Sequence, residues 1–412
     1  MKVSVVIGFI FLSWSHISAQ TDFAALKQQF LDYRKADQQD SALFIARKMN
    51  SLALKEQSDT SIWYAVSWRY IGNCFYDLEI LDSTLFSYEK SLQTLEQQNR
   101  TNSIDAASCY GNIGKYYFEN NDYRKAEYNF KISSDTYKEI NGELSSTYAS
   151  SLNSLGILYK KTNRYLEAED HFKKYLEIIE KTNGKENENY SFALNNLAGL
   201  YEELGQYVKA ENYYLESLEI KKKLKGEKSE MYAKGLKTVA SFYKTMGNYS
   251  KSEQYYIKSS EIYKEINGEI SSSYAFSLNS LGILYKHTDR YKEAEEHYIK
   301  CLEIIEKKYG KEHEKYALEL NNLASLYEEL GQYSKAESYY LNSQEIIKKS
   351  KGENSELYAK SLKIVASFYK TIGNYSASEQ YYIKSSEIYK EIDSELSSNY
   401  AFSLNSLGIL YK

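Results

Sequence analysis

Proline is absent from all 412 residues of this chain. Average usage would place about twenty prolines in a chain of this length. Because proline lacks a backbone donor and clashes with the preceding turn of a helix, its absence favours a chain that is helical almost throughout. No alternation of apolar and polar residues typical of β-strands occurs along the sequence. We therefore predict an all-α fold.

Cysteine is scarce, with only Cys74, Cys109 and Cys301 in the chain. An odd and widely spaced set forms no disulfide framework. Charge of one sign is also lacking, since 52 Lys and Arg oppose 56 Asp and Glu, which gives a net charge of -4. Phosphate backbones are bound by clustered basic charge, so nucleic acid is not the expected partner.

Beyond its first residues, the sequence contains no apolar run long enough to cross a bilayer. At the start, Lys2 precedes an apolar run over residues 3–14, and Ser18 and Ala19 supply small residues. This layout predicts a secretory signal peptide over residues 1–19 that is cleaved and leaves an exported protein, periplasmic or secreted. An uncleaved anchoring segment is the alternative, and no nearby cysteine would carry a lipid.

The most regular feature of the sequence is one short pattern in nine copies, each 42 residues after the last. A small residue stands at the centre of each copy: Gly72, Gly114, Gly156, Ala198, Ala240, Gly282, Ala324, Ala366 and Gly408. An aromatic residue follows three positions later, phenylalanine in the first copy and tyrosine in the other eight. A fixed period in this range is typical of a solenoid built from one supersecondary unit. Such arrays usually present a long binding surface and not a buried catalytic pocket.

Residues 186–226 show the structure expected of one repeat. Apolar residues recur every three or four positions over Tyr190–Leu204, which predicts an amphipathic helix, and a second helix is expected over about Tyr207–Leu224. Between them stands Gly205, in a column that otherwise holds Asn, Asp or Gly, the residues that best tolerate a left-handed helix cap. Small residues such as Ala198 are expected where the helices cross, because a bulky side chain would force the backbones apart.

The two ends differ from the regular repeats. Residues 20–64 are expected to form a degenerate capping hairpin in which Phe30 replaces the small residue of the pattern. Residues 65–412 then hold the tandem repeats, and the last of these stops at Lys412 after its first helix. We therefore expect the sequence to be a fragment of a longer protein.

The sequence also repeats with a longer period of 126 residues, which corresponds to three hairpins. Residues 240–286 and 366–412 match at 41 of 47 positions, and the decapeptide SLNSLGILYK occurs at 151–160, 277–286 and 403–412. Recent duplication explains this period better than selection for a ligand of the same spacing.

The columns Leu-Gly/Ala-x-x-Tyr, then Ala, then Phe/Tyr resemble the tetratricopeptide repeat. The segment LNNLAGLYEELGQYVKAENYYLESLEI at residues 194–220 is especially similar to the repeats of kinesin light chains and their bacterial relatives. The resemblance covers about residues 65–412, although the family's tryptophan occurs only as Trp68 and its closing proline is missing. It implies a right-handed superhelical solenoid of antiparallel helix hairpins, whose first helices line a concave groove.

The resemblance also implies that this groove holds a peptide or a partner helix. Carried onto this sequence, the groove positions are Asn153, Asn195, Lys234, Lys237, Lys244, Asn279, Asn321, Lys360, Lys363 and Lys370. Asparagine amides can bridge the backbone of an extended peptide, and lysines can meet acidic side chains or a terminal carboxylate. We therefore expect a protein or peptide partner, with an acidic peptide favoured; an ordinary solvated face is the alternative.

Candidate catalytic and metal-binding residues do not form a recognisable motif. The histidines at 171, 287, 297 and 313 lack metal-ligand spacing. Carboxylates recur at one position of every repeat, as Glu127, Glu169, Glu211, Glu253, Glu295, Glu337 and Glu379, which indicates a structural or surface feature. Cys301 stands in a column filled mostly by serine and is interpreted as a small packing residue. We expect no enzymatic activity, cofactor or metal.

Three functional hypotheses remain open. The first is a non-enzymatic scaffold that captures protein partners outside the cytoplasm. The second is an N-terminal regulatory or sensor arm of a longer protein whose C-terminal part carries the activity, because similar bacterial arrays precede caspase-like proteases or signalling modules. The third is a spacer without a specific ligand.

Overall fold

The computed structural model describes residues 22–78, 80–393 and 398–410. Within these ranges the chain forms helices joined by short turns and contains no strand, so the all-α prediction is confirmed. The predicted signal peptide, residues 1–19, lies outside the described residues.

The chain divides into two compact units, Met1–Gln206 and Tyr207–Lys412. In the first unit, a helix over residues 22–35 precedes α2 (Gln39–Glu56), α3 (Ile62–Asp77), α4 (Leu81–Gln97), α5 (Ile104–Glu119), α6 (Tyr123–Asn141), α7 (Ser146–Lys161), α8 (Tyr165–Asn183) and α9 (Glu188–Glu203). The second unit contains α10 (Tyr207–Lys225), α11 (Glu230–Thr245), α12 (Tyr249–Asn267), α13 (Ser272–His287), α14 (Tyr291–Tyr309), α15 (Glu314–Glu329), α16 (Tyr333–Lys351), α17 (Glu356–Thr371), α18 (Tyr375–Asp393) and α19 (Ser398–Leu410).

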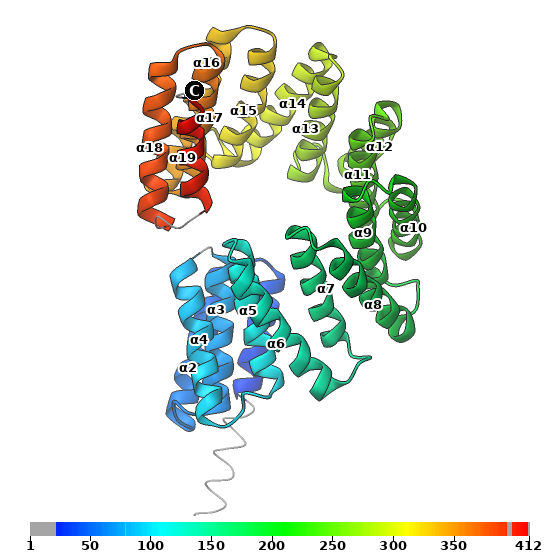
Figure 1. Cartoon of the computed structure of the whole chain (residues 1–412), viewed down its shortest axis with the longest axis vertical. Helices are drawn as coiled ribbons and strands as arrows, with labels where there is room; N and C mark the ends of the chain where they lie inside the picture. The colour runs from blue at the N-terminus through cyan, green and yellow to red at the C-terminus, as the bar shows by residue number, and fades with distance from the viewer. Residues whose placement is uncertain (1–21, 79, 394–397, 411–412) are drawn as a thin grey trace, which may run out of the picture. The chain divides into compact units, whose positions relative to one another are not determined.

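Within each unit, every helix packs against the next one along the chain (Figure 1). The odd-numbered helices from α3 to α19 are the first helices of their repeats, and the even-numbered helices from α4 to α18 are the second helices. The bounds of α9 and α10 lie within two residues of those predicted from the apolar pattern. The fold is thus a solenoid of helix hairpins, as the 42-residue period predicts.

The turn between the two helices of a repeat has the predicted left-handed residue. Gly205 has φ of 70°, and the equivalent Asn121, Asn163 and Asp289 have φ of 60°, 60° and 56°. Asn and Asp are the non-glycine residues that adopt this conformation at least cost, which explains the composition of the column.

The small residue at the centre of each repeat makes room for an aromatic ring from the second helix. A Cβ built on Gly156 would lie 2.6 Å from Phe172, and one built on Gly282 would lie 2.6 Å from Tyr298. Both rings are buried. The ring therefore packs directly on the backbone of the first helix, which confirms that this column is small for a packing reason.

The recurring glutamate and the recurring tyrosine bind each other between adjacent repeats. In each pair the tyrosine hydroxyl of one first helix donates to the glutamate of the preceding second helix, at 2.5–3.2 Å: Tyr159–Glu127, Tyr201–Glu169, Tyr243–Glu211, Tyr285–Glu253, Tyr327–Glu295 and Tyr369–Glu337. This confirms that the glutamate column is structural. The hydrogen bonds join one repeat to the next at the same place each time.

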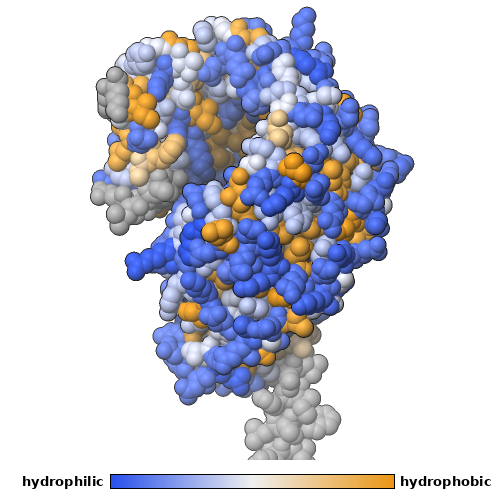
Figure 2. Space-filling model, turned by 45° about the vertical axis from the view of Figure 1, so that its right-hand side comes forward, coloured by the Kyte–Doolittle hydropathy of each residue, from blue (hydrophilic) through white to orange (hydrophobic). Residues whose placement is uncertain are grey.

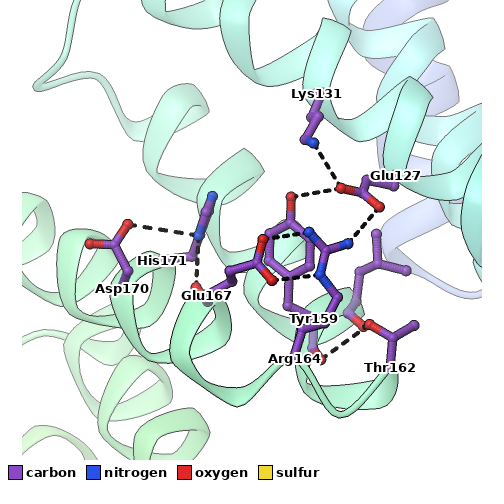
Figure 3. A network of polar contacts seen from close by, with 9 residues as sticks. Glu127, Lys131, Tyr159, Thr162, Arg164, Glu167, Asp170 and His171 are labelled. Carbon is purple, nitrogen blue, oxygen red and sulfur yellow. Dashed lines mark hydrogen bonds and ion pairs between the residues drawn. The ribbon is translucent and has the colours of Figure 1, made fainter.

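Figure 3 shows this Tyr–Glu contact in the first unit, where basic side chains reinforce it. Glu127 accepts from Tyr159 and also forms ion pairs with Lys131 and Arg164, each at 2.7 Å. Arg164 binds Glu167 as well, so its guanidinium joins the helices α6 and α8. The same arrangement recurs 126 residues later around Arg290.

At the two ends of the array, the burial of equivalent residues depends on which helices lie next to them. Phe30, which replaces the small residue in the capping hairpin, is fully buried and stacks on Tyr70 with ring centroids 4.4 Å apart. At the other end, Leu404 of α19 is 44% exposed, whereas Leu278 at the same place in the identical decapeptide of α13 is 4% exposed. The helix α14 covers α13, and this accounts for the difference.

Candidate functional site

The predicted groove residues all belong to the first helices of the repeats. We call the face of these helices that carries them the first-helix face. The first unit has such a face on α3, α5, α7 and α9, and the second unit has its own on α11, α13, α15 and α17. In the first unit α3 packs on α5, and α7 packs on α9, so these first helices lie side by side. Side chains can therefore bridge from one repeat to the next across this face.

Asparagine amides form such bridges in both units. Asn196 of α9 donates to the side-chain oxygen of Asn153 on α7 at 2.6 Å. Asn322 of α15 donates to Asn279 on α13 at 3.2 Å. The predicted groove residues Asn153 and Asn279 thus have their carbonyl oxygens occupied by a neighbouring repeat.

The other two predicted asparagines are free to meet a ligand. Asn195 on α9 and Asn321 on α15 are half-buried. Within the described part of the chain, neither side chain makes a hydrogen bond. Each amide therefore offers two donors and one acceptor at the surface of the first-helix face.

Three of the predicted lysines already have a partner. Lys234 pairs with Glu230 at 2.9 Å and Lys360 pairs with Glu356 at 2.7 Å, each one turn earlier on the same helix. The ammonium of Lys363 lies 3.5 Å from the ring centroid of Phe402 on α19. Burial lowers the pKa of Lys363, and the nearby Lys360 lowers it further.

The remaining lysines are cations without a counter-charge. Lys237 and Lys244 on α11 and Lys370 on α17 form no ion pair with any residue that the structure describes. Lys237 reaches solvent, but the surrounding helix surface displaces enough water to lower its pKa. A desolvated and unpaired ammonium gains more from an incoming carboxylate than a fully hydrated one.

Two further lysines bridge adjacent first helices. Lys160 of α7 pairs with Glu203 of α9 at 3.2 Å, and Lys286 of α13 pairs with Glu329 of α15 at 2.9 Å. These pairs explain why the last turn of α7 and of α13 carries a lysine. They stabilise the face and leave the unpaired charge on α11 and α17.

Sequence reasoning missed a cavity of about 580 Å³ on the first-helix face of the first unit. It lies between α3, α5 and α7, and its lining includes Arg69, Gly111, Lys115 and Phe130. Gly111 occupies the column that holds Asn153, Asn195 and Lys237 in later repeats. This missing side chain was the available signal for the cavity.

The sequence matches a known family of repeat proteins. A family model described as tetratricopeptide repeat matches residues 147–223, 232–306, 273–349 and 316–391, which together cover more than half of the chain. The chain belongs to the tetratricopeptide repeat family.

The solved structures that resemble this tetratricopeptide repeat protein do so at low sequence identity. The apo form of the quorum sensor NprR from B. thuringiensis has a TM-score of 0.51 and 16% identity, over 90% of this chain and 99% of that chain. The protein BtubC (BKLC) from P. vanneervenii has a TM-score of 0.44 and 21% identity, over 60% and 91%. A Rap protein complexed with Competence and Sporulation Factor has a TM-score of 0.49 and 14% identity, over 95% and 98%. No curated protein matches the sequence.

One buried polar cluster departs from the tetratricopeptide repeat pattern. Cys301 on α14 is fully buried, as expected of a packing residue, and beside it lies Glu319 of α15, which is 4% exposed. Asn322 donates to Glu319 at 2.9 Å. Burial raises the pKa of the Glu319 carboxyl, although hydrogen bonds from Asn322 and Cys301 oppose this shift. Burial and the adjacent Glu319 also raise the pKa of the Cys301 thiol.

Two equivalent histidines of this tetratricopeptide repeat protein serve as packing groups. The Nδ1 atoms of His171 and His297 each donate to a backbone carbonyl four residues earlier, at 2.8 Å, and their rings pack on Tyr159 and Tyr285. Among the described residues, no three His, Cys, Asp or Glu side chains are placed to hold a metal ion.

The exposed surface of the array is mixed in polarity. Figure 2 shows a largely hydrophilic face on which apolar residues form small scattered patches. Across the described ranges, no helix combines the length and apolar character needed to span a membrane.

Proposed function

We propose that this protein is a scaffold that binds an extended, acidic peptide segment of a partner protein along the first-helix face of the second unit. The observation that carries the proposal is the set of free polar groups on that face. Asn321 offers an amide, while Lys237, Lys244 and Lys370 offer cations, and none of the four has a partner among the described residues.

The two kinds of group would do different work. An extended peptide exposes N–H and C=O groups along its backbone, and an asparagine amide can satisfy one of each. The lysines would select for negative charge, because acidic side chains gain from unpaired ammonium groups while basic side chains are repelled. A positive face also accelerates encounter with an acidic segment at low ionic strength.

The lysines that already have a partner are not needed for the proposed binding. Lys234 and Lys360 are neutralised by a glutamate one turn away, so their contribution to binding is expected to be small. Lys363 is held over Phe402. The binding charge is therefore concentrated on Lys237, Lys244 and Lys370.

A charge-reversal experiment tests this proposal. Acetylated, amidated peptides of random sequence with a high Asp and Glu content would be selected on the folded protein, and the best binder labelled for fluorescence anisotropy. We expect the triple variant Lys237→Glu, Lys244→Glu and Lys370→Glu to lower its affinity by about tenfold or more, a change of about 1.4 kcal/mol. Added salt should weaken binding to the parent protein for the same reason.

The matched control places the same charge change on the second helices. Lys292→Glu, Lys307→Glu and Lys384→Glu alter exposed side chains of α14 and α18 and keep the net charge equal to that of the test variant. Circular dichroism should show equal helix content in both. Equal affinity of the two triple variants would refute the proposal.

We also propose that the protein is exported and that residues 1–19 are removed. The proposal rests on Lys2, the apolar run that follows it and the small residues Ser18 and Ala19. N-terminal sequencing of protein recovered from outside the cytoplasm should begin at Gln20. Exported protein that retains Met1 would contradict it.

A further inference from the structure

A row of aromatic side chains crosses the second helices of the first unit. Phe44 on α2, Phe86 on α4 and Tyr128 on α6 stand 42 residues apart and are 67%, 58% and 66% exposed. Between these helices lie two half-buried aromatic residues of the first helices, Trp68 on α3 and Tyr110 on α5. We call these five residues the aromatic row.

The aromatic row is continuous because each first-helix aromatic lies beside a second helix. The rings of Trp68 and Phe86 pack edge to face, with their centroids 5.7 Å apart. Trp68 also packs on the core cluster to which α2 contributes, and Tyr110 packs on the cluster that contains Leu95 of α4. Burial raises the pKa of Tyr110, and the neighbouring Tyr128 adds to this shift. The row thus extends from α2 to α6, and contiguous exposed apolar surface marks an interaction site.

The aromatic row is confined to the first three hairpins. At the positions equivalent to Trp68 and Tyr110, every later repeat has leucine. At the positions equivalent to Phe44, Phe86 and Tyr128, the later repeats have only polar residues: Asp170, Asn212, Gln254, Glu296, Ser338 and Gln380. Because the same hairpin forms without these aromatic residues, the stability of the hairpin does not explain them.

The aromatic row offers hydrogen-bond donors that have no acceptor within the described part of the chain. The indole nitrogen Nε1 of Trp68 is buried and makes no hydrogen bond there. An indole nitrogen can only donate, and a buried donor without an acceptor is costly. The hydroxyls of Tyr110 and Tyr128 likewise bond to no residue that the structure describes. Phe86 beside the indole is exposed, and exposed side chains change rotamer within nanoseconds, so a ligand carbonyl can reach the nitrogen.

The charged side chains around the aromatic row balance each other. Helices α2 and α4 each place an aspartate one turn before the aromatic residue and a lysine one turn after it, as in Asp40 and Lys48. On α6, each lysine one turn from Tyr128 is paired with an acidic residue of the same repeat, at 3.1 and 2.7 Å. The remaining charges are two arginines and two glutamates: Arg47, Arg124, Glu89 and Glu96. A surface of balanced charge favours a segment without net charge.

We infer that the aromatic row binds an uncharged, proline-rich segment of a partner protein in the polyproline II conformation. Such a segment has no internal hydrogen bonds, so its carbonyl oxygens need donors, while proline has no N–H that needs an acceptor. Its pyrrolidine rings pack on the exposed aromatic rings, and its carbonyls accept from the indole of Trp68 and the hydroxyls of Tyr110 and Tyr128. A helical segment would leave these donors unused, because its carbonyls are bonded within the helix.

The length of the aromatic row suits a segment of this kind. Four successive helix contacts join α2 to α6, and packed helices lie about 8–10 Å apart, so the row measures at most about 40 Å. Polyproline II rises about 3.1 Å per residue, so about 13 residues at most would cover the row. The site lies on other helices and in another unit than the acidic-peptide site proposed above, and the inference goes beyond that function.

The probe is decaproline with an acetylated N-terminus and an amidated C-terminus, titrated into the whole chain labelled with 15N at tryptophan. We expect saturable binding with Kd below about 1 mM, at least about tenfold tighter than binding of the D-proline enantiomer, which has the same composition and the opposite helical hand. The indole proton of Trp68, assigned by its loss in Trp68→Leu, should shift downfield as it gains an acceptor. No saturable binding, equal affinity for the two enantiomers, or an unmoved indole signal at saturation would overturn the inference.

Two variants test the row with residues that other repeats already use. The first combines Phe44→Gln, Phe86→Gln and Tyr128→Gln, since glutamine stands at the equivalent positions 254 and 380. The second is Trp68→Leu, which introduces the leucine of the later repeats. Both should keep the helix content of the parent in circular dichroism. We expect each to bind decaproline at least about tenfold more weakly, and full affinity in either would overturn the inference.

The matched control removes three exposed apolar side chains from other second helices. Leu166→Gln, Val208→Gln and Ile299→Gln change exposed residues of α8, α10 and α14. This control should bind decaproline as the parent does. Equal weakening by the control and by the triple glutamine variant of the row would place the binding outside the row and overturn the inference.

Other occupants of the aromatic row give distinct results in the same set of proteins. A second copy of the chain would appear in sedimentation as self-association that the triple glutamine variant abolishes and decaproline does not. A sugar chain would appear as binding of cellohexaose that depends on the row in place of decaproline binding. Either result would overturn the inference. The triple glutamate variant of Lys237, Lys244 and Lys370 should bind decaproline as the parent does; if it does not, decaproline binds the second unit and the inference is wrong.

Discussion

One glycine substitution can be placed in two environments within the same decapeptide. Gly282 of α13 and Gly408 of α19 are equivalent residues of SLNSLGILYK. A Cβ on Gly282 would lie 2.6 Å from Tyr298, whereas a Cβ on Gly408 would have no described neighbour within 4 Å. Contacts between carbon atoms are favourable at about 3.5–4.0 Å, so the ring of Tyr298 would have to move by about 1 Å. This ring is only 1% exposed and has little free volume into which to move.

The magnitudes follow from two opposing terms. Glycine in a helix interior costs about 0.5–1 kcal/mol relative to alanine, so Gly408→Ala should stabilise α19 locally by about that amount. Gly282→Val gains some of the same backbone term but overpacks the ring, and overpacking typically costs about 1–3 kcal/mol. We therefore expect Gly282→Val to lower the global stability and Gly408→Val to leave it unchanged.

The assay is urea unfolding followed by circular dichroism, combined with amide hydrogen exchange. Solenoids can unfold in parts, so exchange rates in α13 and α14 report the local effect that a single midpoint would average. Gly282→Val should raise exchange in α13 and α14, and Gly408→Val should not. If the two valine variants lower stability equally, the packing explanation of the small column is wrong.

Three other predictions follow from particular contacts. Tyr285→Phe should cost about 1 kcal/mol at neutral pH through loss of the hydrogen bond to Glu253. Burial, aided by Glu253, raises the pKa of Tyr285 to about 12. The stability that this hydroxyl contributes is therefore complete below pH 10 and is lost as the pH rises toward 12. Urea midpoints of the parent should fall more steeply over that interval than those of the variant. Burial raises the pKa of Glu319 in the folded state, so the stability that its protonated carboxyl contributes is present at low pH and is lost as the pH rises. Glu319→Gln should therefore be more stabilising at pH 8 than at pH 4 in thermal unfolding. The same difference in melting temperature between variant and parent at both pH values would contradict this. Appending a copy of residues 287–309 after α19 should raise the melting temperature and reduce self-association in light scattering, because α14 covers α13 in this way; no change in either would count against it.

Much of the fold could be predicted because the same helix hairpin pattern recurs along the sequence. The 42-residue spacing located the helices, and the Asn, Asp and Gly column located the left-handed turns. The Tyr–Glu bonds could not be predicted in the same way. Both columns were visible, but a hydrogen bond across 32 residues depends on how adjacent hairpins are stacked, and no local rule gives that angle. The glutamate was therefore recognised as structural while its partner was not.

The candidate site was less predictable than the fold. Helical spacing placed the lysines on one face, but it could not show that Lys234 is paired with Glu230 while Lys237 is unpaired. Helical spacing likewise could not show that Asn153 is bonded to Asn196 across two helices. Whether a polar group on a face is available to a ligand depends on neighbours that come from other repeats.

The period of 126 residues bears on which ligands the two units can bind. The helices α7 and α13 carry the same decapeptide, so their own side chains offer the same groups to a ligand. The first helices that precede them, α5 and α11, differ at most positions, and at one of these Gly111 stands on α5 and Lys237 on α11. One face therefore has a cavity at the place where the other has a desolvated cation. The two faces therefore offer different groups at this place, so one peptide cannot satisfy both of them equally.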